Sequence, residues 1–116
     1  MKYSESLKKN QDFRNVYGRG KSCANKYLVM YVLENETGRN RLGISVSKKV
    51  GNSIVRHRLT RLIRESYRLQ EERYRRGLDI VVIARAAAKE KNYHEIDSAM
   101  LHLGRLHTII DRGNVL

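Results

Sequence analysis

The stretch RLGISVSKKVGNSIVRHRLTRLIRESYRLQEERYRR, residues 41–76, changes from a strand pattern to a helix pattern and decides the fold. Its first seven residues alternate between two faces, as a half-buried strand does. One face carries Leu42, Ile44 and Val46, and the other carries Gly43, Ser45 and Ser47. After a short turn, a long helix is predicted to begin with Ser53 as its N-cap and to run to about Arg76, with Gly77 as its stop.

The predicted helix has two contrasting faces. Apolar and small side chains recur at helical spacing on one side, at Val55, Leu59, Leu62, Ile63, Ser66 and Leu69. Basic side chains fall roughly opposite, at His57, Arg61, Arg64, Arg68 and Arg75. We therefore expect one side to pack against the preceding strand and the other to meet solvent or a polyanion.

The remaining elements follow from shorter patterns. A helix is expected from about Asn10, because Phe13, Val16 and Tyr17 share one stripe before Gly18 and Gly20. Residues 27–33 are typical of a strand, and the continuous apolar run at 79–84 is typical of a central strand buried on both faces.

A last helix opens at Asn92, with Glu95 three residues later as in a capping box. Its apolar stripe comprises Ile96, Met100, Leu103, His107 and Ile110. The resulting order, α-β-β-β-α-β-α, predicts an α+β fold, a two-layer sandwich in which helices cover an otherwise exposed sheet.

The composition predicts one folded basic domain over residues 1–116. The chain has 24 Lys and Arg against 12 Asp and Glu, a formal net charge of +12, so we expect a polyanionic partner. Its hydrophobic content of 41% supports a core rather than a disordered tail. A lone cysteine and no recognisable secretion signal favour a reducing cytoplasm, and no apolar run approaches the roughly 20 residues that span a bilayer.

The positive charge is concentrated in residues 48–76, which hold ten Lys or Arg and three Glu, or +7 of the net +12. Two lysines precede the predicted helix, whose first turn directs N–H groups and the positive dipole end outward. Arg61, Arg64 and Arg68 are three and four residues apart, so their guanidinium groups can contact successive phosphates. A solvated helix face is the plainer alternative, but the charge excess and the apparent scarcity of pairing glutamates favour polyanion binding, to DNA or RNA.

The sequence indicates no protein-borne nuclease centre. The four histidines lack the neighbouring carboxylates or thiols that are typical of a zinc site. Glu71 and Glu72 are adjacent and point to different helix faces, so they do not form an acid–base pair. Cys23 falls in an expected strand without an evident base.

Residues 45–68 resemble a known signature. Val-Gly-Asn before an Arg-X-Arg, followed by Arg61 and Arg64, is similar to the RNR signature of the bacterial ribonuclease P protein subunit. Three further segments resemble the same family in order and spacing: LKKNQDF at 7–13, the turn GKS at 20–22 and DIVVIAR at 79–85. The similarity covers nearly the whole chain. It departs from the signature at His57, where Asn is usual, and at Thr60, where a basic residue is usual.

The resemblance implies an α+β fold with a left-handed βαβ crossover, an exception to the usual right-handed rule. It implies that the signature helix and the loop before it bind the catalytic RNA of ribonuclease P, through Lys48, Lys49, Asn52, Arg56, Arg58, Arg61, Arg64 and Arg68. It also implies a cleft between the first helix and the sheet for the single-stranded 5′ leader of precursor tRNA, lined by Phe13, Tyr17 and Tyr31. The RNA subunit then hydrolyses the phosphodiester with Mg²⁺ that it mainly binds itself, and the protein alone holds neither catalytic residues nor metal.

Several alternatives stay open on the sequence. By spacing alone, Phe13, Tyr17 and Tyr31 are ordinary core residues, although aromatic rings beside a basic groove can stack bases of any sequence. A ribosomal or assembly protein that binds RNA without catalytic consequence shares the size and charge, and so does a basic DNA-binding module. The favoured hypothesis is a cytoplasmic ribonucleoprotein subunit without a membrane or an obligate protein partner.

Overall fold

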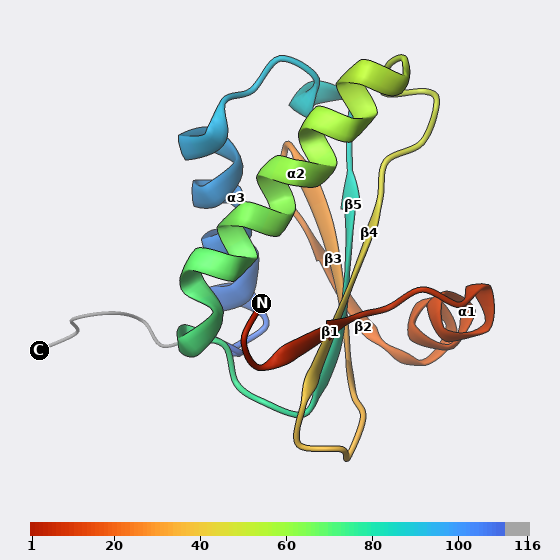
Figure 1. Cartoon of the computed structure of the whole chain (residues 1–116), viewed down its shortest axis with the longest axis vertical. Coiled ribbons are helices and arrows are strands. Elements are labelled where there is room, and N and C mark those ends of the chain that lie inside the picture. The colour runs from red at the N-terminus through yellow and green to blue at the C-terminus, as the bar shows by residue number, and fades with distance from the viewer. Residues whose placement is uncertain (111–116) are drawn as a thin grey trace, which may run out of the picture.

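The computed structural model describes residues 1–110, and within them a five-stranded sheet forms the centre (Figure 1). The sheet order is β1-β4-β5-β3-β2. Strands β1, β4 and β5 run parallel, while β3 is antiparallel to β5 and β2 to β3. The strands are β1 Ser4–Ser6, β2 Lys21–Ala24, β3 Leu28–Glu34, β4 Asn40–Ser45 and β5 Leu78–Ala84. Residues 111–116, the end of the predicted single domain, lie outside this description.

The helices lie on both faces of the sheet (Figure 1). Helix α2, Ser53–Gln70, joins the neighbouring parallel strands β4 and β5 and packs beside α3, Tyr93–Leu106, on one face. Helix α1, Asn10–Arg19, lies on the opposite face. Two short 3-10 turns, η1 Glu71–Arg73 and η2 Ala86–Ala88, flank β5. The predicted α+β class and the order α-β-β-β-α-β-α are confirmed, with β1 as an additional first element.

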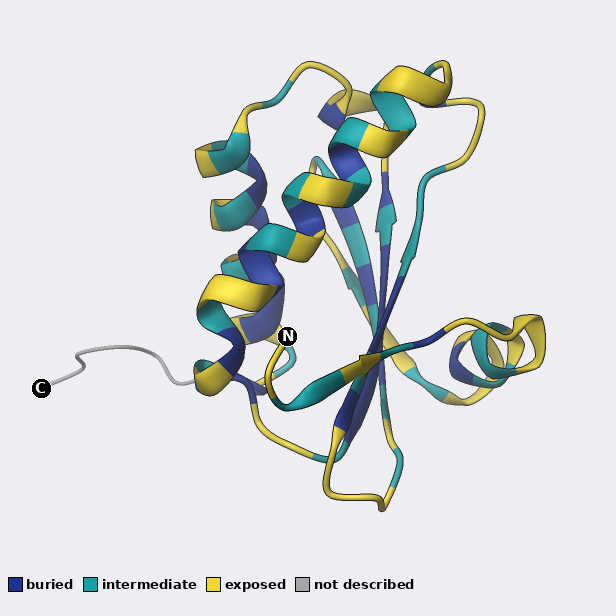
Figure 2. Cartoon of the chain, viewed as in Figure 1, coloured by how far each residue is buried: buried dark blue, intermediate teal, exposed yellow. Residues whose placement is uncertain are grey.

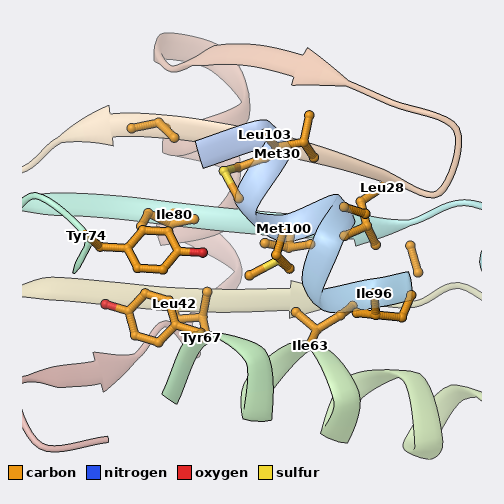
Figure 3. Packing of buried hydrophobic residues seen from close by; sticks show 14 of the residues in the cluster. Leu28, Met30, Leu42, Ile63, Tyr67, Tyr74, Ile80, Ile96, Met100 and Leu103 are labelled. Carbon is orange, nitrogen blue, oxygen red and sulfur yellow. The ribbon is translucent and has the colours of Figure 1, made fainter. Parts of the chain in front are cut away.

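Strand β5 contributes to two cores, which explains its continuous apolar sequence. Ile80 and Val82 face the larger core under α2 and α3, while Val81 faces α1. The larger core is drawn in Figure 3 and includes Leu28, Met30, Leu42, Ile63, Tyr67, Tyr74, Ile96, Met100 and Leu103. The smaller core consists of Leu7, Val16 and Val81, with Phe13, Tyr31, Leu33 and Ile83 packed against it.

Both ends of α2 differ from the prediction. Asn52, not Ser53, is the N-cap, because its Oδ1 accepts a hydrogen bond of 3.0 Å from the N–H of Val55. The helix ends at Gln70, earlier than predicted, and continues as η1. Gly77 does not stop the helix but turns the chain into β5 with a φ of +85°, a left-handed conformation that favours glycine.

The apolar face of α2 is also rotated from the predicted stripe near its C-terminus. Leu69, expected to be buried, is 55% exposed, whereas Tyr67 is fully buried. The Tyr67 hydroxyl lies 2.7 Å from Oγ of Ser4 and accepts a hydrogen bond of 3.1 Å from Nδ2 of Asn40. Tyr67 lies four residues after Ile63 and eight after Leu59, so helical spacing places it on the buried face, but the predicted stripe left it out.

The N-terminal strand β1 and the start of β2 were not predicted. The carboxylate of Glu71 accepts hydrogen bonds from the backbone N–H groups of Lys2 at 2.8 Å and Tyr3 at 2.9 Å. The guanidinium of Arg76 lies 4.3 Å from the ring centroid of Tyr3. These contacts hold the chain where β1 pairs with β4.

Strand β2 begins at Lys21, inside the segment expected as a turn. Both edge strands are short and lack apolar alternation.

Helix α3 opens with the predicted capping box. Oδ1 of Asn92 accepts from the N–H of Glu95 at 2.9 Å, and the carboxylate of Glu95 accepts from the N–H of Asn92 at 3.1 Å. The helix ends before His107, so this residue and Ile110 lie beyond the helix on whose stripe they were expected. Ile110 instead forms a β-bridge with Tyr74.

Candidate nucleic-acid interface

The turn between β4 and α2 presents two lysines to solvent. Lys48 and Lys49 are exposed, while the next residue, Val50, is buried in the larger core and anchors the turn. Gly51 follows with little space around it, since a Cβ there would lie 2.7 Å from the side chain of Val55. The sequence of this turn therefore combines two outward cations with a packed attachment to the fold.

The outer face of α2 carries the exposed arginines Arg61 and Arg64, among the exposed positions that recur along this helix in Figure 2. With His57 and Thr60 they line a shallow hollow of about 340 Å³. The Thr60 hydroxyl donates to the backbone carbonyl of Arg56 at 2.9 Å, so it already has a partner within the helix. The spacing of the two exposed arginines thus places them on one solvent-facing surface, as predicted.

Of three other predicted RNA-binding residues, two make hydrogen bonds within the fold and the third is half-buried. Arg58 donates from both Nη atoms to the backbone carbonyls of Lys89, at 3.1 Å, and Lys91, and so anchors α2 to the segment between η2 and α3. Asn52 uses its Oδ1 to cap α2. Arg56 is half-buried, and its Nε is buried without a hydrogen-bond partner among the described residues. Such an unpartnered donor carries a free-energy cost.

Arg68 differs from Arg61 and Arg64 because it has a carboxylate partner. Its Nε and Nη2 each donate to an oxygen of Glu65 at 2.8 Å. These hydrogen bonds lower the pKa of the Glu65 carboxyl from its ordinary value. The expectation that pairing glutamates are scarce on this surface is wrong here. The RNA contact of Arg68 stays a prediction, for a side chain whose charge is already partly neutralised.

The three aromatic residues predicted for the cleft lie together between α1 and the sheet. The ring centroids of Phe13 and Tyr17 are 6.3 Å apart, and those of Tyr17 and Tyr31 are 5.0 Å apart with an interplanar angle of 72°. Tyr17 is 37% exposed, whereas Phe13 and Tyr31 are half-buried against the smaller core. Burial raises the pKa of the Tyr17 hydroxyl. The cluster is part core and part exposed edge.

A hollow of about 370 Å³ lies beside this cluster and is called the α1 cleft below. Its lining residues are Asn10, Phe13, Arg14, Tyr17, Ile44 and Ser45. Tyr31 does not line it but supports the ring of Tyr17 from the sheet. Arg14, an exposed residue that was not predicted, brings a cation to the cleft. Its position three residues before Tyr17, on the same face of the helix, is the signal that could have identified it.

The small residues of β4 make room for the α1 cleft. A Cβ on Gly43 would lie 2.7 Å from the ring of Phe13, so only glycine lets this ring approach the strand so closely. Ser45 lines the cleft on the same face, while Leu42 points into the larger core. The alternation predicted for residues 41–47 is observed as far as Ser45, where β4 ends, and it places Gly43 and Ser45 toward α1.

A buried ion pair connects α1, β4 and β5 and was missed by the sequence analysis. Asp79, only 2% exposed, accepts hydrogen bonds from Nε and Nη2 of Arg41 at 2.8 and 2.6 Å and from Nδ2 of Asn35 at 2.9 Å. Burial raises the pKa of Asp79, but the hydrogen bonds from Arg41 and Asn35 outweigh it, and the net pKa lies below its ordinary value. Arg41 also reaches Asp12 of α1 at 3.4 Å. These charges are far apart in the sequence, so no local pattern indicated them.

The acidic residues of the described chain are not arranged as a metal centre. Within residues 1–110, no group of three or more His, Cys, Asp or Glu side chains is placed to bind a metal ion. The buried carboxylates of Glu71 and Asp79 already accept hydrogen bonds from backbone and side-chain donors. In the same range, no helix combines the length and the apolar character needed to cross a membrane.

Known proteins resemble this chain in sequence and in fold. Residues 1–106 match the family model for ribonuclease P. The chain is 68% identical to the ribonuclease P protein component of Lachnoclostridium phytofermentans, over 92% of each chain, and 54% identical to that of Alkaliphilus metalliredigens, over 95% of this chain and 99% of the relative. Among solved structures, the RNase P protein of Staphylococcus aureus superposes with a TM-score of 0.86 at 37% identity, over 93% of this chain and 99% of that one. The RNase P protein of Thermotoga maritima superposes with a TM-score of 0.80 at 32% identity, over 87% of this chain and 96% of that one. The chain therefore belongs to the family of ribonuclease P protein components.

Proposed function

We propose that this chain assists ribonuclease P in the endonucleolytic removal of the 5′ leader from precursor tRNA. One surface docks on the catalytic RNA, and the α1 cleft receives the single-stranded leader. The observation that carries the proposal is the pairing, on opposite faces of one sheet, of an exposed basic helix with a half-exposed aromatic cleft. The first suits a phosphate backbone, and the second suits unpaired bases.

Docking on the catalytic RNA rests on the α2 surface, defined here as Lys48, Lys49, His57, Arg61 and Arg64, all exposed. Each cation that neutralises a phosphate releases counterions, so affinity falls as the salt concentration rises. Arg56 adds to this surface, because a phosphate oxygen is a suitable acceptor for its buried Nε after a small rotation of the side chain. Arg58 contributes chiefly by holding α2 in place.

Leader binding rests on the exposed edge of Tyr17. A base of any sequence can stack on such a ring, with a gain of about 1–3 kcal/mol per base, and Arg14 is available for the adjoining phosphate. Ser45, at the edge of the cleft, is joined to Lys48 by a segment that spans at most about 10 Å. A leader in the cleft therefore passes near the start of the α2 surface.

The hydrolysis itself is assigned to the RNA subunit with Mg²⁺. Within residues 1–110, the buried carboxylates of Glu71 and Asp79 already have hydrogen-bond partners, which supports assigning the metal to the RNA. The protein's cations instead offset the repulsion between leader and catalytic RNA and strengthen the binding of Mg²⁺ held mainly by the RNA. The proposed partners are the catalytic RNA and precursor tRNA in the cytoplasm, without a membrane or an obligate protein partner.

Reconstitution with the RNA subunit tests the proposal. Precursor tRNAs with leaders of increasing length are titrated with the RNA alone and with the complex. The protein is expected to lower the Mg²⁺ requirement and to raise affinity for precursor over mature tRNA, by an amount that grows with leader length until the cleft is filled. Equal affinities at every length with and without protein contradict the leader role. Co-purification with whole ribosomal subunits favours an assembly protein, and tighter binding to duplex DNA favours a DNA-binding module.

A further inference from the structure

A hollow of about 550 Å³ lies apart from both proposed RNA surfaces. It is bounded by the turn between β2 and β3 and by α3 from its start to His102. The turn contributes Asn25, Lys26 and Tyr27, and α3 contributes His94, Ser98 and His102 at intervals of four residues along one face. This site, called the Tyr27 hollow below, has an aromatic wall, two imidazoles and a hydroxyl.

The wall formed by the turn is held rigidly. Nδ2 of Asn25 donates to the backbone carbonyl of Ala99 at 3.0 Å and lies 3.2 Å from Nδ1 of His102. Oδ1 of Asn25 accepts from the N–H groups of Tyr27 and Leu28 at 3.2 and 3.0 Å. One amide side chain therefore fixes both the shape of the turn and its distance from α3, so the hollow is formed before any ligand binds.

Two cations lie over the ring of Tyr27. Nζ of Lys91 lies 5.1 Å and Nζ of Lys26 lies 5.9 Å from the ring centroid. Among residues 1–110, Glu95 is the acid that lines the hollow, and it is already engaged, because its carboxylate caps α3 and lies 3.6 Å from Lys91. Both ammonium groups lie over the ring, so a nucleobase can stack on Tyr27 when these flexible side chains move from the ring to its phosphates.

The Tyr27 hollow is linked to α2 by a segment of chain, residues 85–91, that carries several cations. Arg85 donates from Nη1 to the carbonyl of Asn25 at 2.8 Å, and its N–H donates to the carbonyl of Tyr27 at 2.8 Å. The segment that carries Lys89 and Lys91 is bound in turn by Arg58 of α2. The exposed Lys89 and Arg85 and the half-buried Lys91 therefore lie on a segment that contacts both α2 and the turn at Tyr27.

We propose that the Tyr27 hollow binds an unpaired nucleotide of the catalytic RNA, adjacent to the segment docked on α2. The base stacks on Tyr27, its phosphates contact Lys26 and Lys91, and the polar edge of the base faces Ser98 and the two histidines. This inference rests on the proposed docking of α2 on the catalytic RNA and adds a second contact to it, separate from the leader cleft.

Affinity for the RNA subunit alone, with no tRNA present, tests the site. Tyr27→Leu should weaken binding about tenfold because the stacking surface is lost, whereas Tyr27→Phe, which keeps the ring, should stay within about twofold of the original protein. Lys91→Ala should lower the slope of log affinity against log salt by about one. The increase in affinity with leader length should be the same in all three variants.

Arg105→Ala is the matched control, because it removes one exposed charge from α3 outside the hollow and should change the affinity less than Lys91→Ala does. Thermal unfolding followed by circular dichroism verifies that each variant is folded. If Tyr27→Leu does not fold, the salt slope of Lys91→Ala alone tests the proposed site. The proposed site is wrong if folded Tyr27→Leu binds the RNA subunit as tightly as the original protein, or if Lys91→Ala leaves the salt slope unchanged. Either result leaves the proposed docking of α2 intact. If the original protein does not bind the RNA subunit at all, both the docking of α2 and the Tyr27 hollow are contradicted.

Discussion

The α2 surface and the α1 cleft address the same kind of polymer by different physical means. The α2 surface consists of exposed cations on a helix whose other face is buried, so its side chains add charge without supporting the fold. The α1 cleft depends on close packing, because the ring of Phe13 rests on Gly43 and α1 is tied to the sheet through Arg41. Changes on the first should alter RNA affinity alone, and changes in the second should alter the fold as well.

The largest effect is expected from Arg41→Ala. This change leaves the carboxylate of Asp79 buried without its cation, and we expect a loss of about 3 kcal/mol in the free energy of unfolding. Urea denaturation followed by circular dichroism measures it. Arg39→Ala, an exposed arginine in the preceding loop, is the control and should change stability little. A loss below about 1 kcal/mol would show that the buried pair adds little.

The same variant has a distinctive pH dependence. In the original protein the folded pKa of Asp79 is lowered, so the stability from its ion pair is full above the unfolded pKa of about 3.9 and is lost as the pH falls through the folded value. Without Arg41, burial raises this pKa, and protonation then relieves the buried charge. The stability deficit of Arg41→Ala should therefore be smaller near pH 4 than near pH 7. A constant deficit contradicts the assigned role of Asp79.

Gly43→Ala should have the next largest effect and should separate the two surfaces directly. The added Cβ meets the ring of Phe13 at 2.7 Å and Leu7 at 3.1 Å, so overpacking should cost about 1–3 kcal/mol and displace the ring. The gain in precursor affinity with leader length should fall, while affinity for the RNA subunit alone should hold. Gly18→Ala, with open space around its Cβ and a position inside α1, should instead stabilise the protein slightly. If the gain in affinity with leader length is unchanged in Gly43→Ala, Phe13 has no role in leader binding.

The same contrast explains what the sequence predicted and what it did not. Local periodicity was sufficient to identify α2 as a helix, β5 as a central strand and the small face of β4, because each repeats its pattern over several residues, but it misplaced both ends of α2. Strand β1 depends on hydrogen bonds from Glu71, and the Arg41–Asp79 pair joins two strands that meet only in the folded sheet. At the candidate site, spacing identified the exposed arginines, but not that Arg58 binds backbone carbonyls or that Glu65 neutralises Arg68. Those contacts depend on rotamers and tertiary neighbours.

A smaller effect, confined to RNA binding, is expected from Arg61→Ala combined with Arg64→Ala. Both side chains are exposed, so the free energy of unfolding should change by less than about 0.5 kcal/mol. The slope of log affinity for the catalytic RNA against log salt should decrease by about 1.5, because two fewer phosphates are neutralised. Titrations at several salt concentrations measure the slope. An unchanged slope would exclude both arginines from phosphate contact and shift the proposed docking toward the β4–α2 turn.

The smallest effect is expected from Arg68→Ala, compared with Arg64→Ala on the same helix. Arg68 must give up or share its hydrogen bonds to Glu65 before it can bind a phosphate, so its removal should weaken RNA binding less than removal of Arg64 does. Glu65→Gln provides the sharper test. With the carboxylate neutralised, Arg68 becomes available, and RNA affinity should rise while the salt slope steepens. If Glu65→Gln leaves both quantities unchanged, Arg68 lies outside the RNA contact, and the basic surface ends at Arg64.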